Sequence, residues 1–152
     1  MDSPNKISSA TLKRPDKLVV DANPIISALL GGAALRVFWS PSLKEFVTTK
    51  FTINEILPYL PRLAKKISVP EPLLRLELEL LPLTIYEKDW YQGQITEAKK
   101  RIGDRDPNDV DLLALALTLG CPVWSNDHDF EDTGVVLFTT ANLLRSLQLE
   151  EP

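Results

Sequence analysis

The chain has 152 residues, of which 44% are hydrophobic and 25% are charged, a size and composition typical of a globular domain. Its longest uninterrupted apolar run, residues 112–117, is far shorter than the roughly 20 residues that a membrane-spanning helix needs. The net charge of -4, from 21 acidic and 17 basic side chains, argues against a protein that coats nucleic acid through general positive charge. It does not exclude a nuclease, whose catalytic acids would lower the total.

Residues 1–16 are polar and include two prolines, without the apolar core that a secretory signal requires, so we expect a flexible N-terminal arm. The single cysteine, Cys121, lies between two apolar segments and cannot form an intrachain disulfide. It therefore predicts a buried thiol and a cytoplasmic protein. Neither a linker nor a repeat divides the remainder, so residues 17–152 are expected to form a single domain.

A buried strand is expected over residues 17–21, where a β-branched apolar run follows the polar arm. Asn23 is a good N-cap and Pro24 suits the first helical position, so a helix should follow and end at two glycines. Asp21 then lies at the carboxyl end of a strand, where open parallel sheets bind their ligands. A carboxylate at the end of an apolar strand is costly to bury unless it is satisfied.

A second strand is expected over residues 44–49, and Thr52 is placed to cap the next helix, with Glu55 in its first turn. Pro58 and Pro61 each remove a backbone donor, which predicts a kink or two short helices there. The prolines also affect how the Glu55 side chain is oriented.

The later segments alternate between helical and strand patterns. We expect a helix over 68–81 with its leucines mostly inward, a strand over 83–86 and an amphipathic helix over 88–102. A buried helix should follow, with Asp106 as N-cap and Pro107 in its first turn. The last elements expected are strands over 122–125 and 135–138 and a helix over 140–149. This alternation indicates an α/β fold with a mainly parallel central sheet flanked by helices on both faces.

Four carboxylates fall at equivalent places on the carboxyl edge of this sheet: Asp21, Glu55, Asp109 and Asp127. Carboxylates gathered in a small space repel one another, and without a cation some of them hold protons. Oxygen ligands match Mg²⁺ or Mn²⁺, and the chemistry implied is metal-assisted phosphodiester hydrolysis.

Each acid also has a structural interpretation. Asp109 and Glu55 could be first-turn acids, which the helix dipole stabilises by about 0.3–1 kcal/mol. Asp127 could form an Asx turn, and Asp129 could be a fifth, outer ligand or a surface acid.

Three other side chains near these acids receive structural roles. Asp106 is expected to be a cap rather than a ligand, and Asp111 lies about 200° around the helix from Asp109, so it should point elsewhere. His128 is expected to be exposed beside the site, and a zinc centre is not expected.

At these residues the sequence resembles the PIN-domain family of metal-dependent ribonucleases, whose stand-alone members include VapC-type toxins. The matching pieces are VVDAN at 19–23, Glu55, NDVDLLALALTLG at 108–120 and VWSNDHDF at 123–130. The resemblance implies a three-layer PIN-like fold, and a metal site formed by Asp21, Glu55, Asp109, Asp127 and, as an addition, Asp129. No protein nucleophile is needed in such a site.

The resemblance also suggests substrate contacts. Asn23 and Ser125 match polar positions that line the site, although a cap and strand-end hydrogen bonding are the alternatives. Lys50 and Arg105 flank the acid-bearing segments, as do 99–101, and are candidates for meeting RNA phosphates or simply for solvated helix ends. By the same analogy we expect an RNA substrate, a homodimer and a cognate antitoxin.

Two other functions are weighed against a ribonuclease. A response-regulator receiver also gathers acids at a sheet edge, but it needs adjacent acids after the first strand and a phosphoacceptor after the third, and neither is present. A catalytically silent PIN-like module that binds RNA or protein is the second, and the presence of all four acids argues against it.

Overall fold

The computed structural model describes residues 15–43 and 45–150, so residues 1–14 of the expected N-terminal arm lie outside the described part. The strands are β1 (Lys17–Val20), β2 (Glu45–Thr49), β3 (Leu83–Tyr86), β4 (Val123–Trp124) and β5 (Leu137–Phe138). The helices are α1 (Ala22–Leu29), α2 (Ala34–Phe38), α3 (Lys50–Ile56), α4 (Leu60–Lys66), α5 (Glu71–Leu80), α6 (Ile95–Ile102), α7 (Val110–Leu119) and α8 (Thr140–Glu150). Short 3₁₀ turns occur at Leu57–Tyr59, Lys88–Trp90, Gln92–Gln94, Pro107–Asp109 and His128–Phe130.

The five strands form one sheet in the order β3-β2-β1-β4-β5, and every pairing is parallel. The central strand β1 pairs Val19 with Val47 of β2 on one side and with Val123 of β4 on the other. Because the strands are parallel, β1, β2 and β4 all end at the same edge of the sheet, as the sequence predicted.

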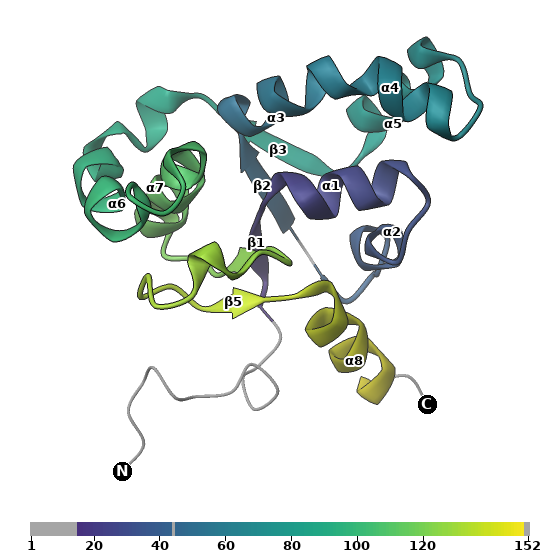
Figure 1. Cartoon of the computed structure of the whole chain (residues 1–152). Coiled ribbons are helices and arrows are strands. Elements are labelled where there is room, and N and C mark those ends of the chain that lie inside the picture. The colour runs from purple at the N-terminus through teal and green to yellow at the C-terminus, as the bar shows by residue number, and fades with distance from the viewer. Residues whose placement is uncertain (1–14, 44, 151–152) are drawn as a thin grey trace.

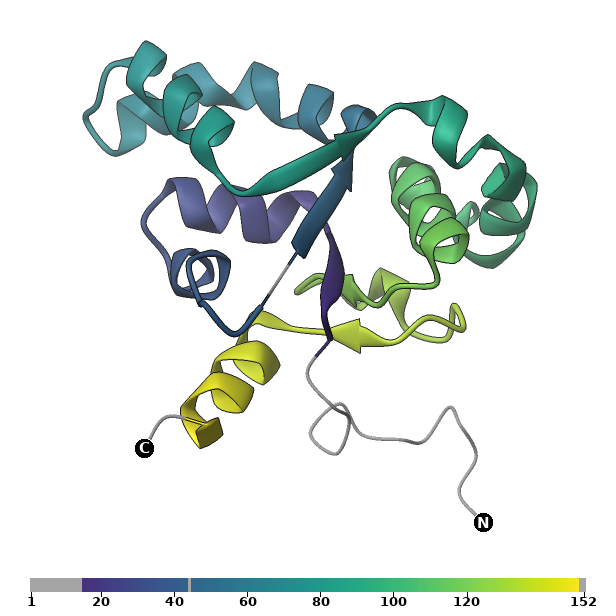
Figure 2. The ribbon, with the colours of Figure 1, turned by 180° about the vertical axis from the view of Figure 1, so that it is seen from behind.

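Helices cover both faces of the sheet, which confirms the expected three layers (Figure 1). Leu18 and Val20 of β1 point into a core cluster shared with α1 to α5 and α8, whereas Val19 points into a second cluster shared with α6 and α7. The view from behind shows the same separation, with the strands running between the two groups of helices (Figure 2). The alternation of side chains along a strand thus builds both cores.

The start of α1 differs from the sequence prediction. Asp21, not Asn23, is the N-cap, and its Oδ1 accepts a hydrogen bond from the Ala22 backbone N at 2.8 Å. Pro24 lies inside the first turn of α1 rather than at the first helical position. Backbone N–H groups of the first turn have no helical partner, so the missing N–H of Pro24 costs no helical hydrogen bond. Asn23 is therefore free to make side-chain contacts within the site.

The start of α3 is also shifted. Thr49 is the N-cap, and its Oγ1 accepts from the Thr52 backbone N at 2.9 Å, so the prediction of Thr52 as the cap is wrong. Because α3 begins at Lys50, Glu55 lies beyond the first turn. The predicted break at the prolines is confirmed by the 3₁₀ turn that separates α3 from α4.

The leucines of α5 do not mostly point inward. Leu74 and Leu78 are buried, but Leu73, Leu76 and Leu80 are 43%, 47% and 62% exposed. A helix on the surface of a sheet can bury only one side, and residues four apart share that side. The outer face of α5 therefore carries apolar side chains.

The remaining elements largely follow the sequence. The segment before α6 forms 3₁₀ turns rather than one long helix, while α7 is buried as predicted and ends at Gly120 with a positive φ of 65°. Cys121 is half-buried rather than buried. No helix within residues 15–43 and 45–150 is long and apolar enough to cross a membrane.

Candidate metal centre

Four aspartates from two separate segments meet at the carboxyl edge of the sheet. Asp106 and Asp109 precede α7, whereas Asp127 and Asp129 follow β4. Each offers one carboxylate oxygen, and these four oxygens all lie within 4.8 Å of one another. We call these four residues the acid cluster.

Asp109 lies in the most demanding position of the acid cluster. Its side chain is only 8% exposed, and Asp109 Oδ2 has no hydrogen-bond partner among the described residues. Burial, followed by the negative charges of Asp21 and Asp106, raises the pKa of Asp109 to about 8. A buried carboxylate oxygen without a donor is costly, so this position favours either a proton or a cation.

Asp21 lies beside the acid cluster, and both of its carboxylate oxygens accept hydrogen bonds from the chain. It is 7% exposed, Ser125 Oγ donates to its Oδ2 at 2.7 Å, and Asn23 Nδ2 approaches the same oxygen at 3.4 Å. Burial raises the pKa of Asp21, while the hydrogen bonds from Ser125 and Ala22 oppose that rise. Asp21 is thus held in one orientation.

Ser125 and Asn23 tie the end of β1 to the segment that carries Asp127. Ser125 Oγ accepts from the Asp127 backbone N at 3.0 Å, and Asn23 Oδ1 accepts from the Asn126 backbone N at 3.1 Å. Both side chains therefore contact Asp21 and the segment that carries Asp127, which are the structural contacts that the sequence left as their alternative roles.

Glu55 lies on α3 and does not belong to the acid cluster. Partial burial raises the pKa of Glu55, and the charges of Asp21, Asp106 and Asp111 raise it further. Glu55 is thus coupled electrostatically to acids of this region. Asp111 itself accepts a hydrogen bond from Tyr91 Oη at 2.6 Å, which satisfies its carboxylate away from the acid cluster.

Asp106 is the member of the acid cluster that the sequence reasoning missed. Its Oδ1 accepts from the Asn108 backbone N at 2.9 Å, so the predicted cap is confirmed. A capping carboxylate still has a second oxygen, and here the residue also contributes to the acid cluster. An acid three positions before Asp109 was the available signal.

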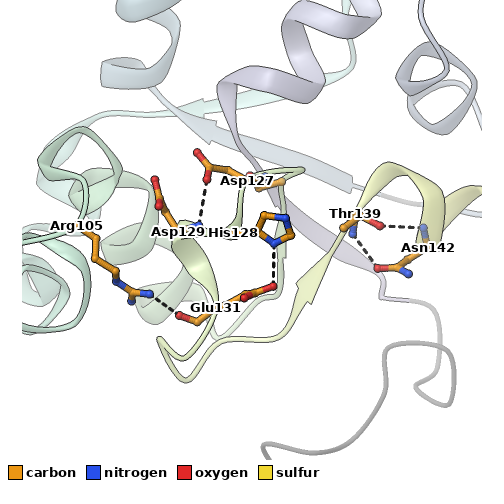
Figure 3. Close-up of polar contacts among 8 residues, drawn as sticks. Arg105, Asp127, His128, Asp129, Glu131, Thr139 and Asn142 are labelled. Carbon is orange, nitrogen blue, oxygen red and sulfur yellow. Dashed lines mark hydrogen bonds and ion pairs between the residues drawn. The ribbon is translucent and has the colours of Figure 1, made fainter.

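The segment after β4 carries Asp127, His128 and Asp129, whose side chains are drawn in Figure 3. Asp127 Oδ1 accepts from the Asp129 backbone N at 3.1 Å, an Asx turn that brings the two side chains together. His128 lies between them in sequence but is directed to solvent, with an 86% exposed side chain whose Nδ1 lies 2.9 Å from Glu131 Oε1. The predicted exposure of His128 is confirmed.

Lys50 and Arg105 are the two cations that the sequence analysis proposed as phosphate contacts. Lys50 is exposed at the first position of α3, directly after the carboxyl end of β2. Arg105 immediately precedes Asp106, and its guanidinium donates to the Glu131 and Arg101 carbonyl oxygens. Partial burial and then the charge of Asp127 raise the pKa of Asp129, and the charge of Arg105 opposes them.

The donor set fits a hard divalent cation. Every member of the acid cluster offers a carboxylate oxygen, the ligand type that Mg²⁺ and Mn²⁺ prefer. Asp109 belongs to that cluster and carries a buried Oδ2 without a partner among the described residues, and a cation at the cluster would neutralise the mutual repulsion of the four acids.

A parallel sheet with its candidate ligand site outside the carboxyl ends of the strands is a general arrangement of α/β proteins. The sequence model of the PIN domain family matches residues 19–148, and the chain therefore belongs to this family. This confirms the resemblance found in the sequence.

Several chains of solved structures are similar to this chain, one of them over most of its length. That one is a chain of the crystal structure of VapBC2 from Rickettsia felis bound to a DNA fragment from their promoter, with a TM-score of 0.56 and 14% sequence identity over 81% of this chain and 98% of that chain. The chain matches no curated protein sequence.

Proposed function

We propose that this protein is a divalent-metal-dependent ribonuclease that cleaves RNA internally. The proposal rests on one observation above the others: Asp109 has a buried Oδ2 without a partner among the described residues, and the same residue belongs to a cluster of four carboxylates. Membership of the PIN domain family supports the same function.

The proposed ligands come from two lines of reasoning. Asp21, Glu55, Asp109 and Asp127 form the set expected from the sequence, with Asp129 as an addition, and the geometry adds Asp106. When bound, Mg²⁺ or Mn²⁺ would activate water for attack on the phosphodiester and neutralise charge that develops at the phosphate.

The other side chains would orient the acids and the RNA. Ser125 and Asn23 fix the Asp21 carboxylate through their hydrogen bonds, so its free lone pairs keep one direction. Lys50 and Arg105 are the proposed contacts for backbone phosphates, which position RNA without reading its sequence. The negative charge of the acids makes such cations necessary next to the site.

The biological setting we propose is a toxin-antitoxin pair in the cytoplasm. The support is the fold that this chain shares with a chain of the VapBC2 structure. Expression of the wild type should then arrest bacterial growth, Asp109→Asn should not, and a cognate antitoxin should relieve the arrest. Growth equal in the two strains, with both proteins accumulating, would contradict a toxin.

We also propose a homodimer, formed through the exposed leucines of α5. Leu73, Leu76 and Leu80 form an outward apolar face, and Leu80 lines an apolar cavity of about 420 Å³ together with the 60% exposed Trp39. Light scattering should give twice the monomer mass for the wild type and the monomer mass for Leu76→Glu. A wild type that is monomeric at every concentration would refute the dimer.

The direct test is cleavage of a panel of single-stranded and structured RNAs with Mg²⁺ or Mn²⁺ and with EDTA. Asp21→Asn, Asp109→Asn and Asp127→Asn should each lose activity by about a thousandfold, because losing an oriented cation removes several kcal/mol of stabilisation. Glu55→Gln should lose about tenfold, as expected for a residue outside the acid cluster. Asp104→Asn is the matched control, an exposed acid of the same connection outside the acid cluster.

The outcomes separate the two leading functions. Metal-dependent cleavage that disappears in the three variants supports the ribonuclease. RNA binding without cleavage in any metal would instead indicate the catalytically silent module, and cleavage unchanged by the substitutions would place the site elsewhere.

A further inference from the structure

Arg105 connects the two chain segments that supply the acid cluster. Asp106 and Asp109 stand before α7, and Asp127 and Asp129 stand after β4, so the chain passes through a full helix and strand between them. Four carboxylates within 4.8 Å of one another repel, and this repulsion pushes the two segments apart. A direct link between the segments would oppose that separation.

The contacts of Arg105 form such a link. Arg105 immediately precedes Asp106, and its Nη1 donates to the carbonyl oxygen of Glu131, two residues beyond Asp129, at 2.8 Å. Its Nη2 donates to the Arg101 carbonyl oxygen at the end of α6, at 3.0 Å. Figure 3 shows the guanidinium directed at Glu131, with Asp127 and Asp129 close by.

A second arginine holds the same loop. Arg101 Nη1 donates to the Thr133 carbonyl oxygen at 2.8 Å, while its Nε is held by Glu97 Oε1 at 3.1 Å. Gly134 has a φ of +87°, and a Cβ at this position would lie 2.8 Å from Arg101 Nη1. The absence of a side chain at Gly134 thus lets α6 and the loop after Asp129 approach closely.

We propose that Arg105 is a positioning residue that holds the two halves of the acid cluster at the separation a divalent cation requires. The inference rests on the proposed metal centre and adds a role to the phosphate contact proposed above. Both hydrogen bonds use backbone carbonyls, so the guanidinium fixes the path of the chain rather than pairing with a ligand carboxylate.

Arg105→Lys separates this geometric role from the effect of charge. A guanidinium has donors on several nitrogens in a fixed plane, so it can bond two carbonyls in different directions, whereas an ammonium is a compact point charge on a flexible stem. The lysine variant keeps the positive charge beside the acids. A role through charge alone therefore predicts unchanged cation binding in this variant, whereas the positioning role predicts weaker binding.

The test is Mn²⁺ binding to the metal-free full chain without RNA, measured by electron paramagnetic resonance of the free ion. We expect Arg105→Lys to bind Mn²⁺ about tenfold more weakly than the wild type, the lower end of the effect of residues that orient metal ligands. Arg62→Lys is the matched control, because Arg62 lies on α4 over the Tyr59 ring and should leave Mn²⁺ affinity unchanged.

Hydrogen exchange provides the second measurement and shows whether the variant is folded. Amides of residues 127–134 should exchange faster in Arg105→Lys, while those of the sheet stay protected. Wild-type Mn²⁺ affinity in Arg105→Lys would overturn the positioning role and leave the metal centre intact. A wild type that binds no Mn²⁺ would overturn both, and a variant that loses sheet protection would show that Arg105 supports the fold rather than the site.

Discussion

Asp21 and Asp109 are neighbouring carboxylates that are buried to the same degree but differ in their hydrogen bonds. They are 7% and 8% exposed. Asp21 accepts hydrogen bonds from a backbone amide and from Ser125, with Asn23 close by, whereas Asp109 Oδ2 has no partner within the described residues. Hydrogen bonds from the chain thus offset the desolvation of Asp21. The buried Oδ2 of Asp109 receives no such bond from the described residues.

The difference shows that burial alone does not mark an acid as a ligand, because its hydrogen bonds must also be considered. A satisfied buried acid is explained by the fold alone, since its hydrogen bonds offset desolvation. An unsatisfied one lowers stability unless a proton or a cation reaches it, so it is the stronger sign of a ligand. Three substitutions test this contrast through the free energy of unfolding of the metal-free protein.

The largest expected change is a loss from Ser125→Ala. The substitution leaves Asp21 Oδ2 and the Asp127 backbone N without the hydroxyl that joins them, so we expect about 3 kcal/mol of destabilisation. Urea unfolding in EDTA measures it, with the exposed Ser42→Ala as control. Equal stability of the two variants would show that the Asp21 network is not the support described.

A smaller change of opposite sign is expected for Asp109→Asn. Removing a buried, repelled carboxylate should stabilise the metal-free protein by about 2 kcal/mol at pH 8, near the raised pKa of about 8. Asp104→Asn should stay within about 0.5 kcal/mol of the wild type, as exposed substitutions do. Destabilisation by Asp109→Asn would mean that the carboxylate is already satisfied.

The smallest change is expected for Asn23→Ala. Its contacts to Asp21 and Ser125 are long, at 3.4 and 3.5 Å, and its bond from the Asn126 amide is exposed, so about 1 kcal/mol of destabilisation is expected. Asn54→Ala, an exposed amide on α3, is the control in the same unfolding assay. A loss larger than that of Ser125→Ala would reverse the assigned importance of the two contacts.

The sheet and the placement of three acids follow from local sequence patterns. Apolar runs ending in Asp21 and before Asp127, with helices between, require parallel strands whose carboxyl ends coincide. Asp109 lies at the start of a helix that is apolar on most sides, so it had to be near the sheet edge.

Other features depend on tertiary structure and were not visible in the sequence. Thr49 and Thr52 are both competent caps, and the register of β2 decides between them. Asp21 and Asn23 are likewise both competent caps, and α1 begins directly after Asp21. Asp106 could be recognised as a cap but not as part of the acid cluster, because only the return of the chain after β4 brings Asp127 and Asp129 to it.

The exposed leucines of α5 have a similar cause. Their spacing allows either face of the helix to be buried, and packing against α4 and α1 selects Leu74 and Leu78. The sequence predicted an apolar helix and could not predict how much of it stays outside.

The pH dependence of stability with and without Mg²⁺ most directly tests the proposal that Asp109 binds a cation. The folded pKa of Asp109, about 8, lies above its ordinary value of 3.8, so its contribution to stability is present at low pH and is lost as the pH rises through 8. The raised pKa values of Asp21 and Glu55 act in the same direction. Metal-free wild type should therefore lose stability between pH 5 and pH 8.5.

Saturating Mg²⁺ should remove most of that loss, because at a concentration of 100 times Kd a ligand stabilises the folded state by about 2.7 kcal/mol. Asp109→Asn should show a flatter pH profile without metal and little response to Mg²⁺. A wild-type profile that Mg²⁺ leaves unchanged at pH 8, or an equal Mg²⁺ response in Asp109→Asn, would contradict the metal centre.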